Sequence, residues 1–127
     1  MSTALDRARR EYLEQQVAAA SPERLVTMLY DRLLVDVERA DAAQAASEWA
    51  AASAALTHAQ AIIAELSGSL DDRWDGAAEL RALYTYLTGR LIVANVAHDA
   101  AATAECRDLI VPLREAWHAA AAALAQP

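Results

Sequence analysis

Four stretches of the chain, each about 20 residues long, repeat their apolar side chains every three or four positions. This spacing places the apolar side chains on one face of an α-helix. The repeat is clearest at Trp49, Ala52, Leu56, Ala59, Ile63 and Leu66. Helices are therefore expected at residues 22–43, 47–67, 77–98 and 100–125. Because the connections between them are short, the sequence predicts an all-α fold, an antiparallel up-down four-helix bundle.

The residue composition agrees with a helical chain. Alanine dominates, and the helix-breaking residues Gly and Pro occur only three times each. Alanine also limits the core, because small side chains bury little apolar area and burial contributes only about 25 cal/mol per Å2. We therefore expect ordinary or low stability, and grooves between helices that side chains do not fill completely.

The first long helix has a well-marked start. The Ser21 hydroxyl is suited to accept hydrogen bonds from the free N–H groups of the first turn. Pro22 suits the first helical position, where its missing N–H costs nothing. The preceding residues 3–17 form a weaker amphipathic segment that is rich in Arg and Glu. The expected organisation is a short N-terminal helical arm or cap, residues 1–20, followed by the bundle, residues 21–127.

Several side chains have expected places within this bundle. Tyr30 is assigned to the core, with its hydroxyl hydrogen-bonded at the core's edge. Pro112 removes a backbone hydrogen bond inside the last helix, which predicts a kink near Asp108. Core-facing positions are also predicted at Leu25, Leu29, Leu33, Val37 and Ala40 in the first helix, and at Cys106, Leu109, Leu113, Trp117, Ala120 and Leu124 in the last.

The charge pattern excludes some classes of partner. The formal net charge is -7, and all 11 basic residues are Arg without a basic cluster. Such a surface argues against a nucleic-acid partner and against binding to anionic membranes. No segment resembles a signal peptide or is long and apolar enough for membrane insertion. The single cysteine excludes a disulfide framework, so a cytosolic location is expected.

No motif in the sequence supports catalysis or metal binding. Glu115 and His118 form one E-x-x-H unit, but di-iron bundles need two, so an exposed helix pair is favoured. The loop that begins at Asp71 faintly resembles a calcium loop, although Arg73 takes a ligand position. Cys106 falls in an apolar stripe, which favours a small buried thiol over a nucleophile. We expect no enzymatic activity, no cofactor and no metal.

The third helical stretch, residues 77–98, is apolar nearly all round. Its apolar or large side chains include Tyr84, Tyr86, Leu87, Leu91, Ile92, Val93 and Val96. Such a helix is either central in a bundle or partly uncovered for a partner. The second stretch also carries Ile62 beside Ile63, more apolar width than a single seam uses. The pattern alone leaves both alternatives open.

Four strings of residues line up with one protein family in order and spacing. They are Ala20-Ser21-Pro22 with Met28-Leu29-Tyr30-Asp31; residues 59–66 with Leu70; Leu83-Tyr84-Thr85-Tyr86 with Arg90-Leu91, Ala94-Asn95 and Asp99; and residues 113–117. From about Tyr12 to Trp117, this arrangement resembles the flagellar secretion chaperones of the FliS family. The resemblance implies a cytoplasmic helical bundle that binds the disordered C-terminal segment of flagellin, prevents premature polymerisation and helps to deliver the subunit to the flagellar type III export gate.

The resemblance and the apolar pattern together suggest where the partner would bind. We expect apolar grooves along the second and third helical stretches to hold the flagellin segment. The residues expected to face the partner are Tyr12, as the contact of the N-terminal cap, and Ile62, Ile63, Leu66, Tyr86, Leu91 and Asn95. For Asn95, a hydrogen bond to its own helix or to water is an equal alternative. The competing hypothesis is a non-catalytic bundle module with a different partner or with weak self-association as a homodimer.

Overall fold

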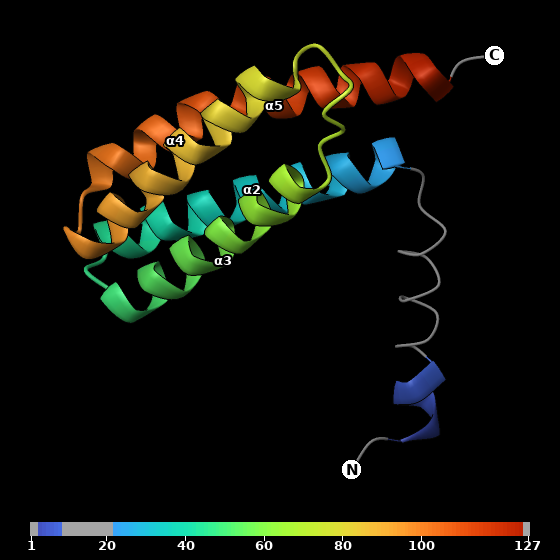
Figure 1. Ribbon diagram of the computed structural model, residues 1–127. Coiled ribbons are helices and arrows are strands. Elements are labelled where there is room, and N and C mark those ends of the chain that lie inside the picture. Colours follow the sequence, from blue (N-terminus) through green and yellow to red (C-terminus); the bar gives the residue numbers. More distant parts are fainter. Residues whose placement is uncertain (1–2, 9–21, 126–127) are drawn as a thin grey trace.

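The computed structural model describes residues 3–8 and 22–125, and four long helices make up most of this part of the chain. They are α2 (Pro22–Ala45), α3 (Trp49–Gly68), α4 (Ala77–Val96) and α5 (Ala100–Ala125). Residues 4–8 are also helical. Each of α2 and α4 packs against both α3 and α5, so sequential helices are neighbours around a ring (Figure 1). The predicted all-α bundle is confirmed.

The helix ends differ from the predicted ends by at most two residues. α2 continues to Ala45, α3 begins at Trp49, and α4 ends at Val96, whereas α5 has the predicted bounds. Two residues in left-handed backbone conformation, Ser47 (φ 56°) and His98 (φ 52°), stop α2 and α4. The N–H that follows each of them donates to a carbonyl five residues back, at 2.8 Å for Glu48 to Ala43. This pattern satisfies carbonyls that the end of a helix leaves free.

The start of α5 is closed by a side chain. Asp99 Oδ1 accepts hydrogen bonds from the N–H groups of Ala101 at 3.0 Å and Ala102 at 3.2 Å. Asp is well suited to this position because its carboxylate satisfies donors that have no partner within the helix. α5 continues through Pro112 to Ala125. The kink near Asp108 stays a prediction.

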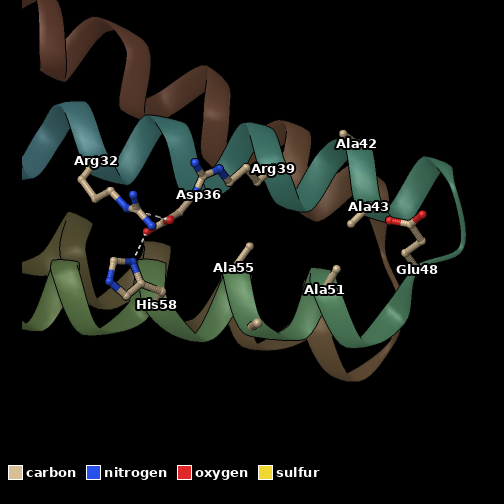
Figure 2. A pocket seen from close by; sticks show the side chains of 10 residues that line it. Arg32, Asp36, Arg39, Ala42, Ala43, Glu48, Ala51, Ala55 and His58 are labelled. Atoms are coloured by element: carbon tan, nitrogen blue, oxygen red, sulfur yellow. Dashed lines mark hydrogen bonds and ion pairs between the residues drawn. The ribbon is translucent and has the colours of Figure 1, made fainter. Parts of the chain in front are cut away.

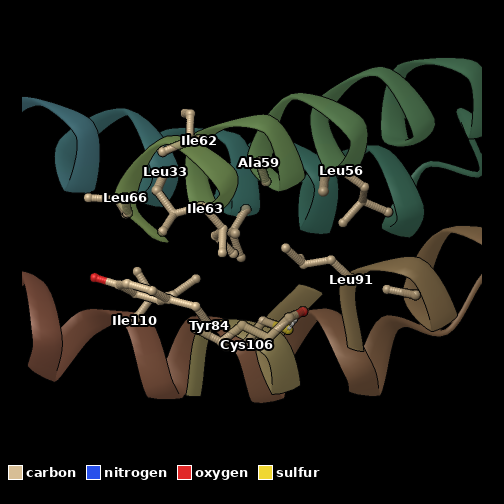
Figure 3. Close-up of a cluster of buried hydrophobic side chains, with 14 of the residues drawn as sticks. Leu33, Leu56, Ala59, Ile62, Ile63, Leu66, Tyr84, Leu91, Cys106 and Ile110 are labelled. Carbon is tan, nitrogen blue, oxygen red and sulfur yellow. Dashed lines mark hydrogen bonds between the residues drawn. The ribbon is translucent and has the colours of Figure 1, made fainter. Parts of the chain in front are cut away.

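The core contains the aliphatic side chains that the periodic pattern indicates, together with buried alanines (Figure 3). Four positions expected in it are exposed instead: Leu25, Trp49, Ala120 and Leu124. Leu25 and Trp49 belong to the first turn of their helices, and Ala120 and Leu124 lie near the end of α5, where fewer neighbouring residues cover a side chain. Leu25 was expected to face the core, but the next residue, Val26, is half-buried and packs against the core instead.

The predicted position of the Tyr30 hydroxyl is also corrected. The Tyr30 side chain is fully buried, and its hydroxyl bonds the Tyr84 hydroxyl at 2.5 Å within the core, not at its edge. Burial raises the pKa of both phenols, although their mutual hydrogen bond and the Trp117 indole act to lower that of Tyr30. Both groups therefore stay neutral and tie α2 to α4 through the middle of the bundle.

Candidate partner-binding surface

Beyond Glu79 in its first turn, the outer face of α4 carries no charged side chain. Its residues recur every three or four positions, and all are exposed: Ala78, Ala82, Thr85, Tyr86, Gly89, Ile92, Val93 and Val96. The basic residues of α4 are turned to its flanks, where Arg81 pairs with Asp72 at 2.7 Å and Arg90 pairs with Glu105 at 2.7 Å. Exposed apolar side chains in a continuous row are typical of an interaction surface.

The outer face of the neighbouring helix α3 consists mainly of small side chains. The exposed positions on this face are Ala50, Ala54, Thr57, Ala61, Ala64, Glu65 and Gly68. A shallow depression near the end of this helix is lined by Ala61, Ala64, Glu65, Gly68 and Ser69. Small side chains let another helix approach closely, whereas the larger side chains of α4 supply apolar area. We call the two outer faces together the α3–α4 surface.

The other two helices present charged side chains to solvent. Arg32, Glu38, Arg39 and Asp41 are exposed on α2, and Arg107, Asp108 and Glu115 are exposed on α5. The charged groups of the bundle are therefore distributed unevenly among its helices. Binding of an apolar partner segment removes water from charged side chains that it covers, and this costs free energy. The cost is smallest on the α3–α4 surface, because few charged side chains lie there.

Tyr86, the largest side chain of the α4 face, is held in place by α5. Its hydroxyl donates to Glu105 Oε2 at 2.6 Å, and Arg90 Nε donates to the other carboxylate oxygen at 2.7 Å. The two hydrogen bonds lower the pKa of Glu105, and the carboxylate raises the pKa of Tyr86. The tyrosine ring thus has a fixed orientation, which reduces the entropy lost when a partner binds.

The residues that the sequence predicts as partner-facing fall into three groups. Ile62, Ile63, Leu66 and Leu91 are buried in the core and are not exposed as partner-facing side chains would be (Figure 3). Tyr86 is exposed and Asn95 is half-buried. Tyr12 lies outside the described residues. The role of these residues in partner binding stays a prediction.

Three large exposed apolar residues of α4 were not predicted to face the partner: Ile92, Val93 and Val96. They lie beside the buried stripe of the helix. Ile92 directly follows the buried Leu91, and Val93 directly precedes the buried Ala94. Val96, at the end of the helix, is 78% exposed. The signal in the sequence was that α4 is apolar on both sides, but periodicity does not show which side the other helices cover.

The E-x-x-H pair has a structural setting different from the expected one. His118 Nε2 and Arg114 Nε both contact Asp31 Oδ1, at 2.6 Å and 2.7 Å, so α5 is linked to α2. Burial acts to raise the pKa of Asp31, but the hydrogen bonds from His118 and Arg114 outweigh it and the pKa is lowered. Glu115 is exposed as predicted, whereas His118 is half-buried and bonded.

A cavity between α2 and α3 has a volume of about 630 Å3 (Figure 2). Its polar wall contains Asp36, which is almost fully buried and contacts both Arg32 and His58. The rest of the wall is mainly alanine. The cavity agrees with the expectation that an alanine-rich bundle leaves grooves unfilled. The Asp36 carboxylate is already engaged by two basic side chains of the protein.

The described residues contain no group of three or more His, Cys, Asp or Glu side chains that could hold a metal ion. In the loop before α4, Asp71 is engaged by Arg73, whose Nε donates at 3.0 Å. Cys106 is buried, and burial raises its pKa to about 11. A thiol in this state is a poor nucleophile at neutral pH. Among the described helices, none has the length and apolar character needed to span a bilayer.

Comparison with known proteins identifies the family. The family model "Flagellar protein FliS" matches residues 5–124. The flagellar secretion chaperone FliS of Salmonella typhimurium is 35% identical over 108 residues, which cover 83% of this chain and 80% of that protein. The Bacillus subtilis protein of the same name is 31% identical over 106 residues, 84% of this chain and 80% of that protein. This chain therefore belongs to the FliS family of flagellar secretion chaperones.

Proposed function

We propose that this protein is a cytosolic export chaperone that binds the disordered C-terminal segment of flagellin on its α3–α4 surface. Binding there prevents premature polymerisation and assists delivery of the subunit to the flagellar type III export gate. The observation that carries the proposal is the partly apolar outer face of α4, which is without charge beyond Glu79 in the first turn, beside the small-residue face of α3. Membership of a family of secretion chaperones supports a binding role without catalysis.

The size of the proposed contact follows from its free-energy balance. Folding of a disordered segment on binding costs about 2–5 kcal/mol. Complete burial of a large apolar side chain contributes about 1.5–3 kcal/mol, so each partly exposed one contributes about 1 kcal/mol. The four largest apolar side chains of the α4 face, Tyr86, Ile92, Val93 and Val96, only offset that cost. The flagellin segment must therefore also contact α3.

The geometry of the surface favours a helical partner. An amphipathic helix can place its apolar residues against the row on α4 and pack closely against the small side chains of α3. Asn95, half-buried near the end of α4, can hydrogen-bond backbone groups of the bound segment. Ile62, Ile63, Leu66 and Leu91 would reach the partner only where binding separates α3 and α4 from the other helices.

Isothermal titration calorimetry with the C-terminal segment of flagellin tests this proposal. Val96→Asp and Val93→Asp introduce a charge into the α4 face, and each is expected to weaken binding at least about tenfold, or about 1.4 kcal/mol. The matched controls are Leu124→Asp and Leu25→Asp, which lie on α5 and α2. Leu25 is as exposed as Val93, at 38%, and Leu124 is 69% exposed against 78% for Val96.

The controls are expected to change the affinity by less than about twofold, since exposed substitutions away from a contact have small effects. Circular dichroism must show that all four variants remain helical. Equal losses in all four variants, or normal binding by both Val variants, would exclude the α3–α4 surface. An absence of measurable binding to the wild-type chain would exclude flagellin's C-terminal segment as the partner.

The same surface also fits a second copy of this chain, which is the alternative function. Ala78, Ala82 and Gly89 on α4 are small enough to let two such helices approach closely. Sedimentation measurements separate the two functions. Self-association that is lost in Val96→Asp, together with no affinity for flagellin, would favour the alternative.

A further inference from the structure

A small cavity with aromatic walls lies where α3 ends and α4 begins. Its volume is about 220 Å3. Every one of the four long helices contributes to it, and the connection between α3 and α4 supplies the rest of its wall. The lining residues are Val26, Leu66, Ser69, Leu70, Asp71, Trp74, Tyr84 and Trp117. Of the residues that line the depression on α3, only Ser69 also lines this cavity, and none of the exposed residues of the α4 face does.

The polar side chains of the wall are already engaged within the protein. Ser69 Oγ donates to the carbonyl oxygen of Leu66 at 2.9 Å. The Asp71 carboxylate accepts hydrogen bonds from the Arg73 guanidinium at 3.0 Å, 3.3 Å and 2.8 Å. The Tyr84 hydroxyl is paired with that of Tyr30. A charged ligand would lose its hydration without gaining a new partner from these three groups, so the cavity is suited to an uncharged one.

The volume and the aromatic wall indicate the class of ligand. A cavity of about 150 Å3 lined by apolar side chains is enough to bind benzene, so this cavity has room for one substituted ring. The Trp74 and Trp117 rings are arranged edge to face, with centroids 6.3 Å apart and an interplanar angle of 62°. A further ring can add to such a cluster in the same geometry, which aromatic pairs prefer.

Trp74 lies at the opening, and its position depends on the glycine that precedes α4. Half of the Trp74 side chain is exposed to solvent. A Cβ atom on Gly76 would come within 2.6 Å of its ring, so only glycine allows the indole to fold back against the start of α4. The ring therefore covers a ligand on one side while it remains in contact with water on the other.

We propose that this cavity is a binding site for one uncharged aromatic ring, covered by Trp74. The ring is supplied either by a free small molecule or by an aromatic side chain of a bound protein segment. The proposal does not depend on flagellin binding, because it concerns a different part of the bundle.

Fluorine NMR with 4-fluorotoluene as the probe tests the site. We expect saturable binding to the wild-type chain, with a dissociation constant of about 1 mM or tighter. In 1H–15N NMR spectra of the protein, the probe should shift the backbone amide signals near Ser69 and Leu70 but not those near Trp49. Val26→Phe would place a ring in the cavity from α2 and should weaken binding at least about tenfold. Leu25→Phe is the matched control, since it adds the same ring at the preceding, exposed position and should leave binding unchanged.

A second variant keeps the test informative if Val26→Phe does not fold. Trp74→Ala removes the covering ring, which is half exposed and outside the core, and should weaken binding at least about threefold. N-acetyl-phenylalanine amide, compared with N-acetyl-alanine amide, shows whether a side chain on a peptide backbone enters as well as the free ring. If 4-fluorotoluene gives no saturable shift, or binds Trp74→Ala and Val26→Phe as it binds the wild-type chain, the proposed site does not exist.

Discussion

Gln44 joins three helices at the end of the bundle where α2 and α4 terminate. Its Nε2 donates to the carbonyl oxygen of Ala94 on α4 at 3.1 Å, and its Oε1 accepts from the Thr103 hydroxyl on α5 at 2.7 Å. All of these contacts are buried. A buried amide with both ends paired fixes the relative position of the helices, because any other alignment leaves polar atoms without partners.

Gln44→Ala is expected to lower the free energy of unfolding by about 1–3 kcal/mol, because the Ala94 carbonyl and the Thr103 hydroxyl lose a partner inside the core. Urea denaturation followed by circular dichroism measures the change. Gln60→Ala is the control: Gln60 is a half-buried glutamine on α3 that makes no side-chain hydrogen bond within the described part of the chain. Its replacement should cost less than about 0.5 kcal/mol, and an equal cost at both positions would contradict the role of Gln44.

The helices themselves follow closely from the sequence, and the exceptions have local physical reasons. Apolar periodicity and the scarcity of Gly and Pro suffice to predict each of the four long helices to within two residues. The end of α4 was predicted too late because His98 has no sequence signal for a left-handed conformation, which a glycine would have provided. The candidate site was harder to predict. Leu91 and Ile92 are adjacent and equally apolar, and only the packing of α4 decides that the first is buried and the second exposed.

Ser47, which ends α2 with a positive φ, is a place where one substitution should stabilise the protein. A left-handed conformation costs a residue with a Cβ roughly 1–2 kcal/mol, whereas glycine adopts it freely. After the greater entropy loss of glycine is subtracted, Ser47→Gly should raise the free energy of unfolding by up to about 1 kcal/mol. Ser53→Gly, inside α3, should lower it by a similar amount. Thermal denaturation of both variants checks the opposite signs, and a lower melting temperature for Ser47→Gly would contradict the argument.

The link between α2 and α5 predicts how stability depends on pH. The pKa of Asp31 is lowered in the folded protein, so the folded state favours the charged carboxylate more than the unfolded state does. Its contribution is present above the ordinary pKa of about 3.8 and is lost as the pH falls through the lowered folded value. Asp31→Asn should therefore destabilise the protein at pH 6, and the difference from the wild-type chain should shrink below about pH 4. Urea unfolding across this range measures it; a difference independent of pH would exclude the mechanism.

At the scale of the whole molecule, two carboxylates of α2 link it to both of its neighbours, while the outer faces of α3 and α4 remain largely without charge. Asp31 contacts His118 of α5, and Asp36 contacts His58 of α3. The net charge of -7 keeps such a protein soluble although it exposes an apolar row. The arrangement therefore separates two requirements: charged groups on one side support solubility and hold the bundle together, and the other side is available to a partner.

This separation predicts a weak dependence of flagellin binding on salt. Ion pairs between exposed groups are screened as ionic strength rises, whereas burial of apolar area is not. If the flagellin segment binds the α3–α4 surface, its affinity should change by less than about threefold between roughly 0.05 M and 0.5 M NaCl, because that surface offers few charges to pair. Calorimetric titrations at the two concentrations measure the ratio. A loss of binding at high salt would instead place the partner on the charged faces of α2 and α5, where Arg39 and Arg107 are exposed.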